Sequence, residues 1–467
     1  MACDWKTTTF EESSIEILDG DRGKNYPKKS EFTESGYCLF LNTGNVTKDG
    51  FKFSSTEFIS SERDQLLRKG KLQREDVVLT TRGTVGNVAY YDSSIPFDHI
   101  RINSGMVILR SDDTKILPRY LYLFLRSKLF EDQVIALQSG SAQPQLPIRD
   151  IKRVEIKVPS VTEQKTIAHI LGTLDDKIEL NRQMNETLEA MAQALFKSWF
   201  VDFDPVIDNA LAAGNAIPDA LQKKAAERAE QRKGIKKKDN SDIQALFPDE
   251  FEFTEDMGWI PKGWGASTLD DLTTELRRGI SPKYTEVDGV RVVNQRCIRN
   301  HSIDYSVCRL NDESLRKVEG RHLEVGDVVV NSTGVGTLGR MAQVLYLDEP
   351  AVVDSHVTIV RPNTELVKPY TFGRLMLSIE PLVESMGLGS TGQTELSRVH
   401  LGELVVCVPP IKLQEFVEKS FLSYSDKSAF NIQQNITLAK LRDTLLPKFM
   451  SGELRIADAV ALVDEAI

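Results

Sequence analysis

The stretch D-D-K-I-E-L-N-R-Q-M-N-E-T-L, residues 175–188, is echoed by S-D-K-S-A-F-N-I-Q-Q-N-I-T-L, residues 425–438. The two stretches align at an offset of 250 residues, and the same offset continues without a gap upstream to Gln164 and Gln414. A repeat of this length indicates that the chain contains two copies of one structural unit. Each copy is predicted to be a mixed domain followed by one long helix.

The repeated stretch carries the seam pattern of a coiled coil, with seam positions separated by alternating steps of four and three residues. In the first copy the seam is Ile167, Leu171, Leu174, Ile178, Asn181, Asn185, Leu188 and Leu195. In the second copy it is Val417, Phe421, Tyr424, Asn431, Asn435, Leu438 and Leu445. Two such helices in one chain can cover each other's apolar stripe, so we expect them to pair as an antiparallel coiled coil.

Four asparagines occupy matched seam positions, namely Asn181, Asn185, Asn431 and Asn435. A polar residue in a coiled-coil seam costs stability but can fix the register and the choice of partner. We therefore predict that these asparagines set the register of the helix pair. The alternative is that they face solvent.

The predicted fold class is α+β, with two mixed domains and two long helices related by a pseudo-two-fold repeat. The expected boundaries are 1–158 for the first domain, 159–200 for the first long helix, 201–258 for a linker with a charged helix, 259–408 for the second domain, and 409–467 for the second long helix and a tail.

The composition is that of an ordinary globular protein, with 41% hydrophobic and 27% charged residues. No run approaches the roughly 18 apolar residues of a membrane span, and the N-terminus lacks the basic and apolar regions of a signal peptide. The five cysteines are scattered and never spaced as C-x-x-C, which favours a cytoplasmic protein. The net charge of −10 lies mostly outside the two domains, so it neither proves nor excludes a DNA partner.

The known catalytic motifs are missing from the sequence. Residues 334–339 satisfy G-x-G-x-x-G, but the segment that follows is too short and too extended for a dinucleotide-binding helix, so a turn between strands is predicted. There is no phosphate loop, no H-E-x-x-H, no G-x-S-x-G and no Asn-Pro-Pro-aromatic motif, and the six histidines lack ligand spacing. We therefore expect a binding protein with no catalytic residues, no metal and no cofactor of its own.

The repeated motifs resemble those of a known family. Two mixed domains, each followed by P-x-x-x-x-Q and then D-K-x-x-x-N-x-x-x-N-x-T-L, resemble the DNA-specificity subunit of type I restriction-modification enzymes. The resemblance covers essentially the whole chain. It implies a prokaryotic, cytoplasmic protein whose two domains each read one half of a split double-stranded DNA target, with the helices acting as a ruler for the unread gap.

The resemblance also implies partners that perform the chemistry. Two methyltransferase subunits would dock on the helices and bring S-adenosylmethionine for adenine N6 methylation. Motor-nuclease subunits would join them and use ATP and magnesium to cleave unmodified DNA in antiviral defence.

Candidate DNA-binding residues lie in loops rich in side chains that read base edges or hold phosphates. In the first domain they are Arg22, Lys24, Asn25, Tyr26, Lys28, Asn42, Thr43, Asn45, Thr81, Arg82, Thr84, Ser141, Gln143 and Gln145. In the second domain they are Arg278, Ser281, Lys283, Tyr284, Asn294, Gln295, Arg296, Ser332, Thr333, Arg340, Thr391 and Gln393.

Two other functions remain open from the sequence. A stand-alone DNA-modifying enzyme would methylate DNA without partners. A coiled-coil adaptor that does not read DNA would show no sequence-dependent affinity even with methyltransferase subunits present.

Overall fold

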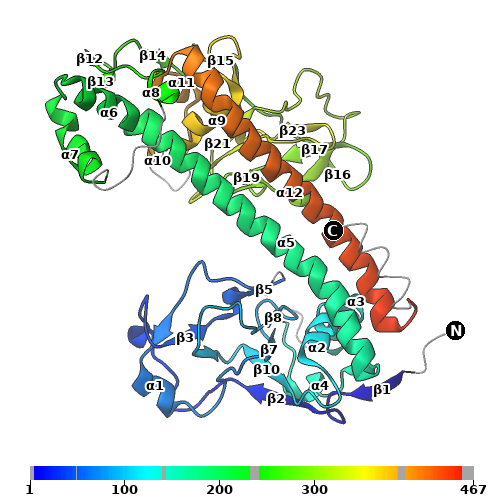
Figure 1. Ribbon diagram of the computed structural model, residues 1–467. Helices are drawn as coiled ribbons and strands as arrows, with labels where there is room; N and C mark the ends of the chain where they lie inside the picture. Colours follow the sequence, from blue (N-terminus) through cyan, green and yellow to red (C-terminus); the bar gives the residue numbers. More distant parts are fainter. Residues whose placement is uncertain (1–4, 49, 139–143, 232–240, 388–394, 455–467) are drawn as a thin grey trace. The chain divides into compact units, whose positions relative to one another are not determined.

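The computed structural model describes residues 5–48, 50–138, 144–231, 241–387 and 395–454. The chain divides into two compact units (Figure 1). Unit 1 comprises Met1–Asn181 with Gln433–Ile467, and unit 2 comprises Arg182–Ile432. Each unit therefore contains one mixed domain and one part of each long helix.

The centre of unit 1 is a four-stranded antiparallel sheet in the order β2(Ile15–Asp19), β10(Met106–Ser111), β7(Val77–Thr80), β8(Val88–Tyr90). In β7, Val77 and Leu79 enter one hydrophobic core, while Val78 enters another. Both faces of the strand are buried, and for this reason the run V-V-L is apolar without alternation. The sheet thus separates two cores inside the same unit.

A second, three-stranded sheet covers one face of this central sheet, in the order β6(Phe58–Ile59), β3(Cys38–Leu41), β9(Ile100–Ile102). β3 and β9 run parallel, and β6 is antiparallel to β3. The loops that follow these strands carry the first group of site candidates. The smaller elements around them are η1(Lys29–Glu31), η2(Thr43–Asn45), the hairpin β4(Val46–Thr47)–β5(Gly50–Phe51) and α1(Ser61–Leu66).

Helices cover the other face of the central sheet. The elements on this side are α2(Pro118–Leu125), α3(Lys128–Leu137), α4(Ile148–Ile151), the strand pair β1(Lys6–Thr9)–β11(Glu155–Val158) and parts of α5(Val161–Phe196) and α12(Ile411–Ser451). Ile167 and Leu171 of α5 share this core with Leu438 and Phe449 of α12. In unit 1 the beginning of one helix therefore packs against the end of the other.

Unit 2 repeats this plan, with a fourth strand in its second sheet. Its central sheet has the order β15(Thr273–Arg278), β24(Val357–Pro362), β21(Val328–Asn331), β22(Met341–Gln343), and its second sheet the order β16(Tyr284–Thr285), β20(Arg309–Asn311), β17(Val290–Val293), β23(Ala351–Val353). The remaining elements are the hairpin β18(Ile298–Arg299)–β19(Ser302–Ile303), η5(Tyr305–Val307), α9(Pro369–Ser378), α10(Glu380–Ser385), α11(Arg398–Gly402) and the pair β14(Gly265–Thr268)–β25(Val405–Val408). The internal repeat and the α+β class are confirmed.

The predicted linker is folded onto unit 2. It contains a π-helical turn (Lys197–Val201), α6(Asp204–Ala213), η4(Asp219–Leu221), α7(Gln222–Gln231), α8(Ser241–Gln244) and the hairpin β12(Phe251–Thr254)–β13(Gly258–Pro261). Phe203, Val206 and Phe247 join the core of unit 2. The β12–β13 hairpin lies across the expected boundary at 258/259, because the residues from Phe251 onward are already paired with the start of the second domain.

The P-x-x-x-x-Q motif ties each long helix to its domain. Gln164 and Gln414 are fully buried, and each Nε2 donates to the carbonyl of the proline five residues earlier, at 3.0 and 2.8 Å. Each Oε1 accepts the backbone N–H of the residue that precedes α2 or α9, at 2.8 and 2.9 Å. The motif thus satisfies polar groups at two helix starts with one side chain.

The G-x-G-x-x-G run forms the turn between the antiparallel strands β21 and β22, as predicted. Gly334, Gly336 and Gly339 all have positive φ, which explains the glycines without a nucleotide. In the part of the chain that the structure describes, no helix combines the length and apolar character needed to cross a bilayer.

Candidate nucleic-acid interface

In unit 1 the structure brings several predicted residues together at one end of the two sheets. The Thr84 hydroxyl lies 3.5 Å from the carbonyl of Thr43, and Arg82 forms an isolated antiparallel bridge with Gln145. Arg82 and Thr84 are exposed. Loops that are far apart in sequence therefore present a guanidinium, an amide and hydroxyl groups side by side.

A second group of unit 1 candidates lies near this end, where Arg22 and Tyr26 contact Ser104. Arg22 donates to the carbonyl of Ser104 (3.3 Å) and pairs with Asp19 (3.1 Å). The Tyr26 phenol also hydrogen-bonds Ser104, and burial of the ring raises its pKa. Asn25 donates to the carbonyl of Leu66 (3.1 Å), which fixes the loop between them. Lys24 and Lys28 are exposed beside this group, as expected for phosphate contacts.

Three of the predicted contact residues are buried and form hydrogen bonds inside their own unit, so their contact with DNA stays a prediction. Asn45 is 3% exposed, and its amide donates to the carbonyls of Lys52 and Ser55 (3.0 and 2.7 Å) while its oxygen accepts from the N–H of Asn42. This network also places Asn42 in the N-cap of η2. The hydroxyls of Thr81 and Ser332 are likewise bonded inside their units, to Gly105 O and to Thr358 Oγ1.

In unit 2 the equivalent end is built around Gln295. Its amide donates to Thr333, whose hydroxyl lies 2.9 Å from Nδ1 of His356. The side chain of Asn294 accepts the backbone N–H of Arg296 (2.9 Å), so that the turn presents an exposed guanidinium. The arrangement again combines an amide, a hydroxyl and an arginine at the strand ends.

Other unit 2 candidates lie around this centre. Arg278 pairs with Glu395 (2.9 Å) and donates to the carbonyl of Leu396. Tyr284 is stacked by the Arg309 guanidinium at 3.5 Å from the ring centre. Ser281 and Lys283 are exposed near Tyr284, whereas Arg340 is half-buried. Ser141, Gln143, Thr391 and Gln393 lie outside the described residues.

Sequence reasoning missed several residues that share these loop ends. They are Asn103 and Ser104 in unit 1, and Arg309, His356 and Glu395 in unit 2. A signal was present for one of them, because Glu395 stands at the repeat offset from Gln145. It forms the same kind of bridge, with Thr333. The others belong to loops without a run of Arg, Asn or Gln, so composition did not single them out.

The seam asparagines form a network between the two long helices. Asn181 donates to Asn435 (2.9 Å), and at the repeated positions Asn431 donates to Asn185 (2.8 Å). Asn435 and Asn185 donate in turn to a backbone carbonyl of the facing helix, at 3.2 and 3.3 Å. Asn181 and Asn431 are 2% and 0% exposed, so these two do not face solvent. Their role in setting the register stays a prediction.

The remaining seam candidates are buried or half-buried. In unit 1 the polar flank of the seam is closed by Asp175, whose carboxylate pairs with Arg126 (2.7 Å) and Arg442 (2.8 Å). This arrangement joins α2, α5 and α12. The helices are therefore fastened to the domain by ion pairs as well as by apolar packing.

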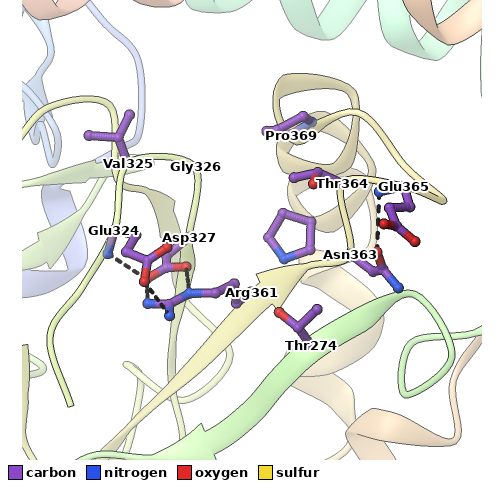
Figure 2. Close-up of a pocket in the computed structure, with 11 residues that line it drawn as sticks. Thr274, Glu324, Val325, Gly326, Asp327, Arg361, Asn363, Thr364, Glu365 and Pro369 are labelled. Atoms are coloured by element: carbon purple, nitrogen blue, oxygen red, sulfur yellow. Dashed lines mark hydrogen bonds and ion pairs between the residues drawn. The ribbon is translucent and has the colours of Figure 1, made fainter. Parts of the chain in front are cut away.

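Unit 2 also contains a cavity of about 500 Å³, bordered by β15, β24 and residues 324–327 (Figure 2). Arg361 reaches into its wall, where it pairs with Asp327 (2.7 Å) and Glu324 (2.7 Å). The hydrogen bond to Asp327 raises the pKa of Arg361 further. The residues that line the cavity include no serine, cysteine or histidine. Among the described residues, no cluster of three or more His, Cys, Asp or Glu side chains could hold a metal ion.

Comparison with known proteins identifies a protein family to which this chain is similar. Residues 8–190 match the model of the type I restriction modification DNA specificity domain. The Type I restriction enzyme HindI specificity subunit of Haemophilus influenzae is 24% identical over 472 aligned residues, which cover 93% of this chain and 98% of that protein. The chain is similar along nearly its whole length to DNA specificity subunits of type I restriction-modification systems.

Further comparisons give the same similarity. The Type I restriction enzyme MjaIX specificity subunit of Methanocaldococcus jannaschii is 25% identical over 395 residues, covering 82% of this chain and 78% of the relative. The crystal structure of a type I restriction-modification S subunit from M. genitalium has a similar fold, with a TM-score of 0.53 and 15% identity over 96% of both chains. The resemblance drawn from the repeated helix motif is confirmed.

Proposed function

We propose that this specificity subunit selects the DNA sequence on which a type I restriction-modification complex acts, and that each unit reads one half of a split target. The observation that carries the proposal is the duplicated framework, which presents different exposed or half-buried side chains at the equivalent end of each unit. Arg82 and Gln145 stand at these ends in unit 1, and Gln295, Arg296 and Thr333 in unit 2. A duplicated reader with unlike loops fits a target with two unlike halves.

The chemistry of these side chains fits readout in the major groove. An arginine can donate two hydrogen bonds to O6 and N7 of guanine, and a glutamine can pair with N6 and N7 of adenine. We assign these roles to Arg82 and Arg296 and to Gln145 and Gln295. Basic side chains further out, such as Lys24 and Lys283, hold phosphates and carry no sequence information.

The chain performs no chemistry in this proposal. Two methyltransferase subunits bring S-adenosylmethionine and methylate adenine N6, and motor-nuclease subunits use ATP and magnesium. Docking of two equivalent partners is supported by apolar side chains that the helix pair leaves uncovered. Leu180 of α5 and Phe430 of α12 are 52% and 55% exposed and stand at the repeat offset of each other. Met184 and Met191 extend this stripe along α5.

The long helices fix the gap between the half-sites. Helix α5 has 36 residues and α12 has 41, and a helix rises about 1.5 Å per residue. A pair of helices would define a spacing more sharply than a flexible linker. Deleting one heptad from both helices is expected to change the permitted gap. An unchanged gap would refute the proposal that the helices act as a ruler.

The proposal is tested by mapping methylated adenines across the genome of a host that expresses this chain with its methyltransferase partner. The expected result is a split motif with a fixed gap. A continuous motif contradicts the proposal. Methylation by the purified chain alone would establish a stand-alone enzyme, whereas a complex without sequence-dependent DNA affinity would identify an adaptor.

A further inference from the structure

The hairpin that follows the Asn294–Arg296 loop in unit 2 has an unusual tip. Strands β18 and β19 are joined by Asn300 and His301, which have φ values of 50° and 57°. Residues other than glycine rarely adopt this left-handed conformation. Asparagine and histidine are among the non-glycine residues that adopt it most often. Backbone strain of this kind is often found at functional sites, and the contacts of the His301 side chain are therefore of interest.

His301 lies between two helices and contacts an acidic residue on each. Its Nδ1 is 3.5 Å from Glu189 Oε1 of α5, and its Nε2 is 3.3 Å from Glu380 Oε2 of α10. Nδ1 also lies 3.1 Å from the side-chain amide of Gln193, one turn further along α5. Hydrogen bonds to Glu189 and Glu380 raise the pKa of His301 to about 9, so the ring is positively charged at neutral pH.

Both carboxylates are held by further groups. Glu189 accepts a 2.5 Å hydrogen bond from Arg374 of α9, a side chain that is only 5% exposed. Although desolvation raises its pKa, the bonds from His301 and Arg374 lower the pKa of Glu189 to about 2. Glu380 accepts the N–H of Met341 (3.1 Å) at the start of β22. The histidine is therefore anchored to a fixed framework.

The hairpin transmits this anchoring to the loop. The N–H of Asp304 donates to the carbonyl of Cys297 (2.8 Å), which closes the hairpin onto the end of the loop. The N–H of Cys297 donates to the carbonyl of Asn294 (2.9 Å). Within this turn, Gln295 contacts Thr333 of the neighbouring loop. Movement of the hairpin tip would thus displace the amide and guanidinium groups of the loop.

We propose that His301 is a positioning residue for DNA recognition by unit 2. By bridging Glu189 and Glu380, it fixes the Asn294–Arg296 loop relative to α5 in the orientation that reads the second half-site. This inference rests on the proposed function for its consequence at DNA, but the bridge itself is testable without DNA. It makes the long helix part of the reading apparatus of unit 2.

The bridge is tested first by hydrogen exchange of the chain in complex with its methyltransferase partners, without DNA. His301→Gln removes the charge and is expected to increase exchange at residues 294–304 while unit 1 is unchanged. Lys48→Gln is the matched control, because Lys48 occupies the equivalent hairpin turn of unit 1. Unchanged exchange in the His301→Gln variant would overturn the inference, whatever the complex does with DNA.

The consequence for recognition is tested by methylation rates on duplexes that carry single substitutions in either half-site of the mapped motif. His301→Gln is expected to reduce discrimination at the second half-site about tenfold and to leave the first half-site as in the wild type. His301→Arg, which restores a cation, is expected to recover most of the loss. Equal loss at both half-sites, no loss at either, or no recovery with His301→Arg contradicts the inference. Absence of any split motif in the wild type counts against the proposed function instead.

Discussion

In both units an aspartate inside the central sheet pairs with an arginine of the adjacent strand, Asp76 with Arg110 in unit 1 and Asp327 with Arg361 in unit 2. Both aspartates are 1% exposed, and each also accepts the N–H of the residue three positions earlier. These contacts recur atom for atom. These buried contacts are therefore the same in the two copies, because both copies fold into the same central sheet.

The units differ where side chains leave the framework. At the bridge that joins two loops, unit 1 presents Arg82 and Gln145, whereas unit 2 presents Thr333 and Glu395. The ties to the long helices differ too, since Asp175 is held by two arginines and Glu189 by an arginine and a histidine. The comparison indicates that loop positions at the strand ends diverge while positions facing the core are retained.

The largest expected effect tests the equality of the two frameworks. Asp76→Ala removes the carboxylate that pairs with Arg110, and Asp327→Ala removes the buried carboxylate that pairs with Arg361, which keeps its contacts with Glu324 and Glu275; each loss is expected to cost about 3 kcal/mol. We expect each variant to destabilise its own unit by a similar amount, measured by native-state hydrogen exchange in the two central sheets. A large cost in one unit and none in the other would break the comparison.

A second pair of variants tests the shared helix anchor. Gln164→Leu and Gln414→Leu remove the bonds that satisfy backbone groups at two helix starts, and each is expected to cost about 2 kcal/mol. Exchange of the amides at the start of α2 or α9 should report the loss in the corresponding unit. An equal effect of one variant on the amide exchange of both units would contradict this prediction.

A smaller effect is expected from pH and is confined to unit 2. Glu189 and Gln193 of α5 and Glu380 of α10 face His301, with Arg374 of α9 beside Glu189. Because the pKa of His301 is raised from 6.5 to about 9, its stabilisation is complete below pH 6.5 and is lost as the pH rises through about 9.

Partial exposure of the ring reduces the expected loss in unit 2 to about 1.5 kcal/mol between pH 7 and pH 10. The measurement is the urea midpoint of unit 2, followed by exchange, for the wild type and His301→Gln. The variant should not show the loss. If the urea midpoint of unit 2 has the same pH dependence in the wild type and in His301→Gln, other titrating groups cause that dependence.

The smallest effect on stability concerns the seam. Replacing Asn185 and Asn431 together by leucine exchanges a buried polar pair for apolar packing, so stability is expected to stay within about 1 kcal/mol of the wild type or to rise. The permitted gap between half-sites should broaden, because the register is less restricted. Asn181 and Asn435 form the matched pair. A gap as narrow as in the wild type would remove the register role.

The sequence predicted the architecture well because the repeat and the helix seam are periodic and local. The steps of four and three residues placed Ile167 and Phe421 in the seam, and both are fully buried. The reading loops were harder, because a polar side chain in a loop can serve either a target or the fold. Asn45 and Ser332 are buried and form hydrogen bonds within the fold, whereas Arg82 and Arg296 are exposed, and only the three-dimensional contacts show this difference.

The central claim, that each unit reads its own half of the target, is tested most directly by comparing methylation maps of two variants in complex with the methyltransferase partner. Arg82→Ala is expected to relax one half of the split motif, and Gln295→Ala the other half, with the gap unchanged in both maps. If either substitution alters both halves, or if the two relax the same half, the claim is contradicted.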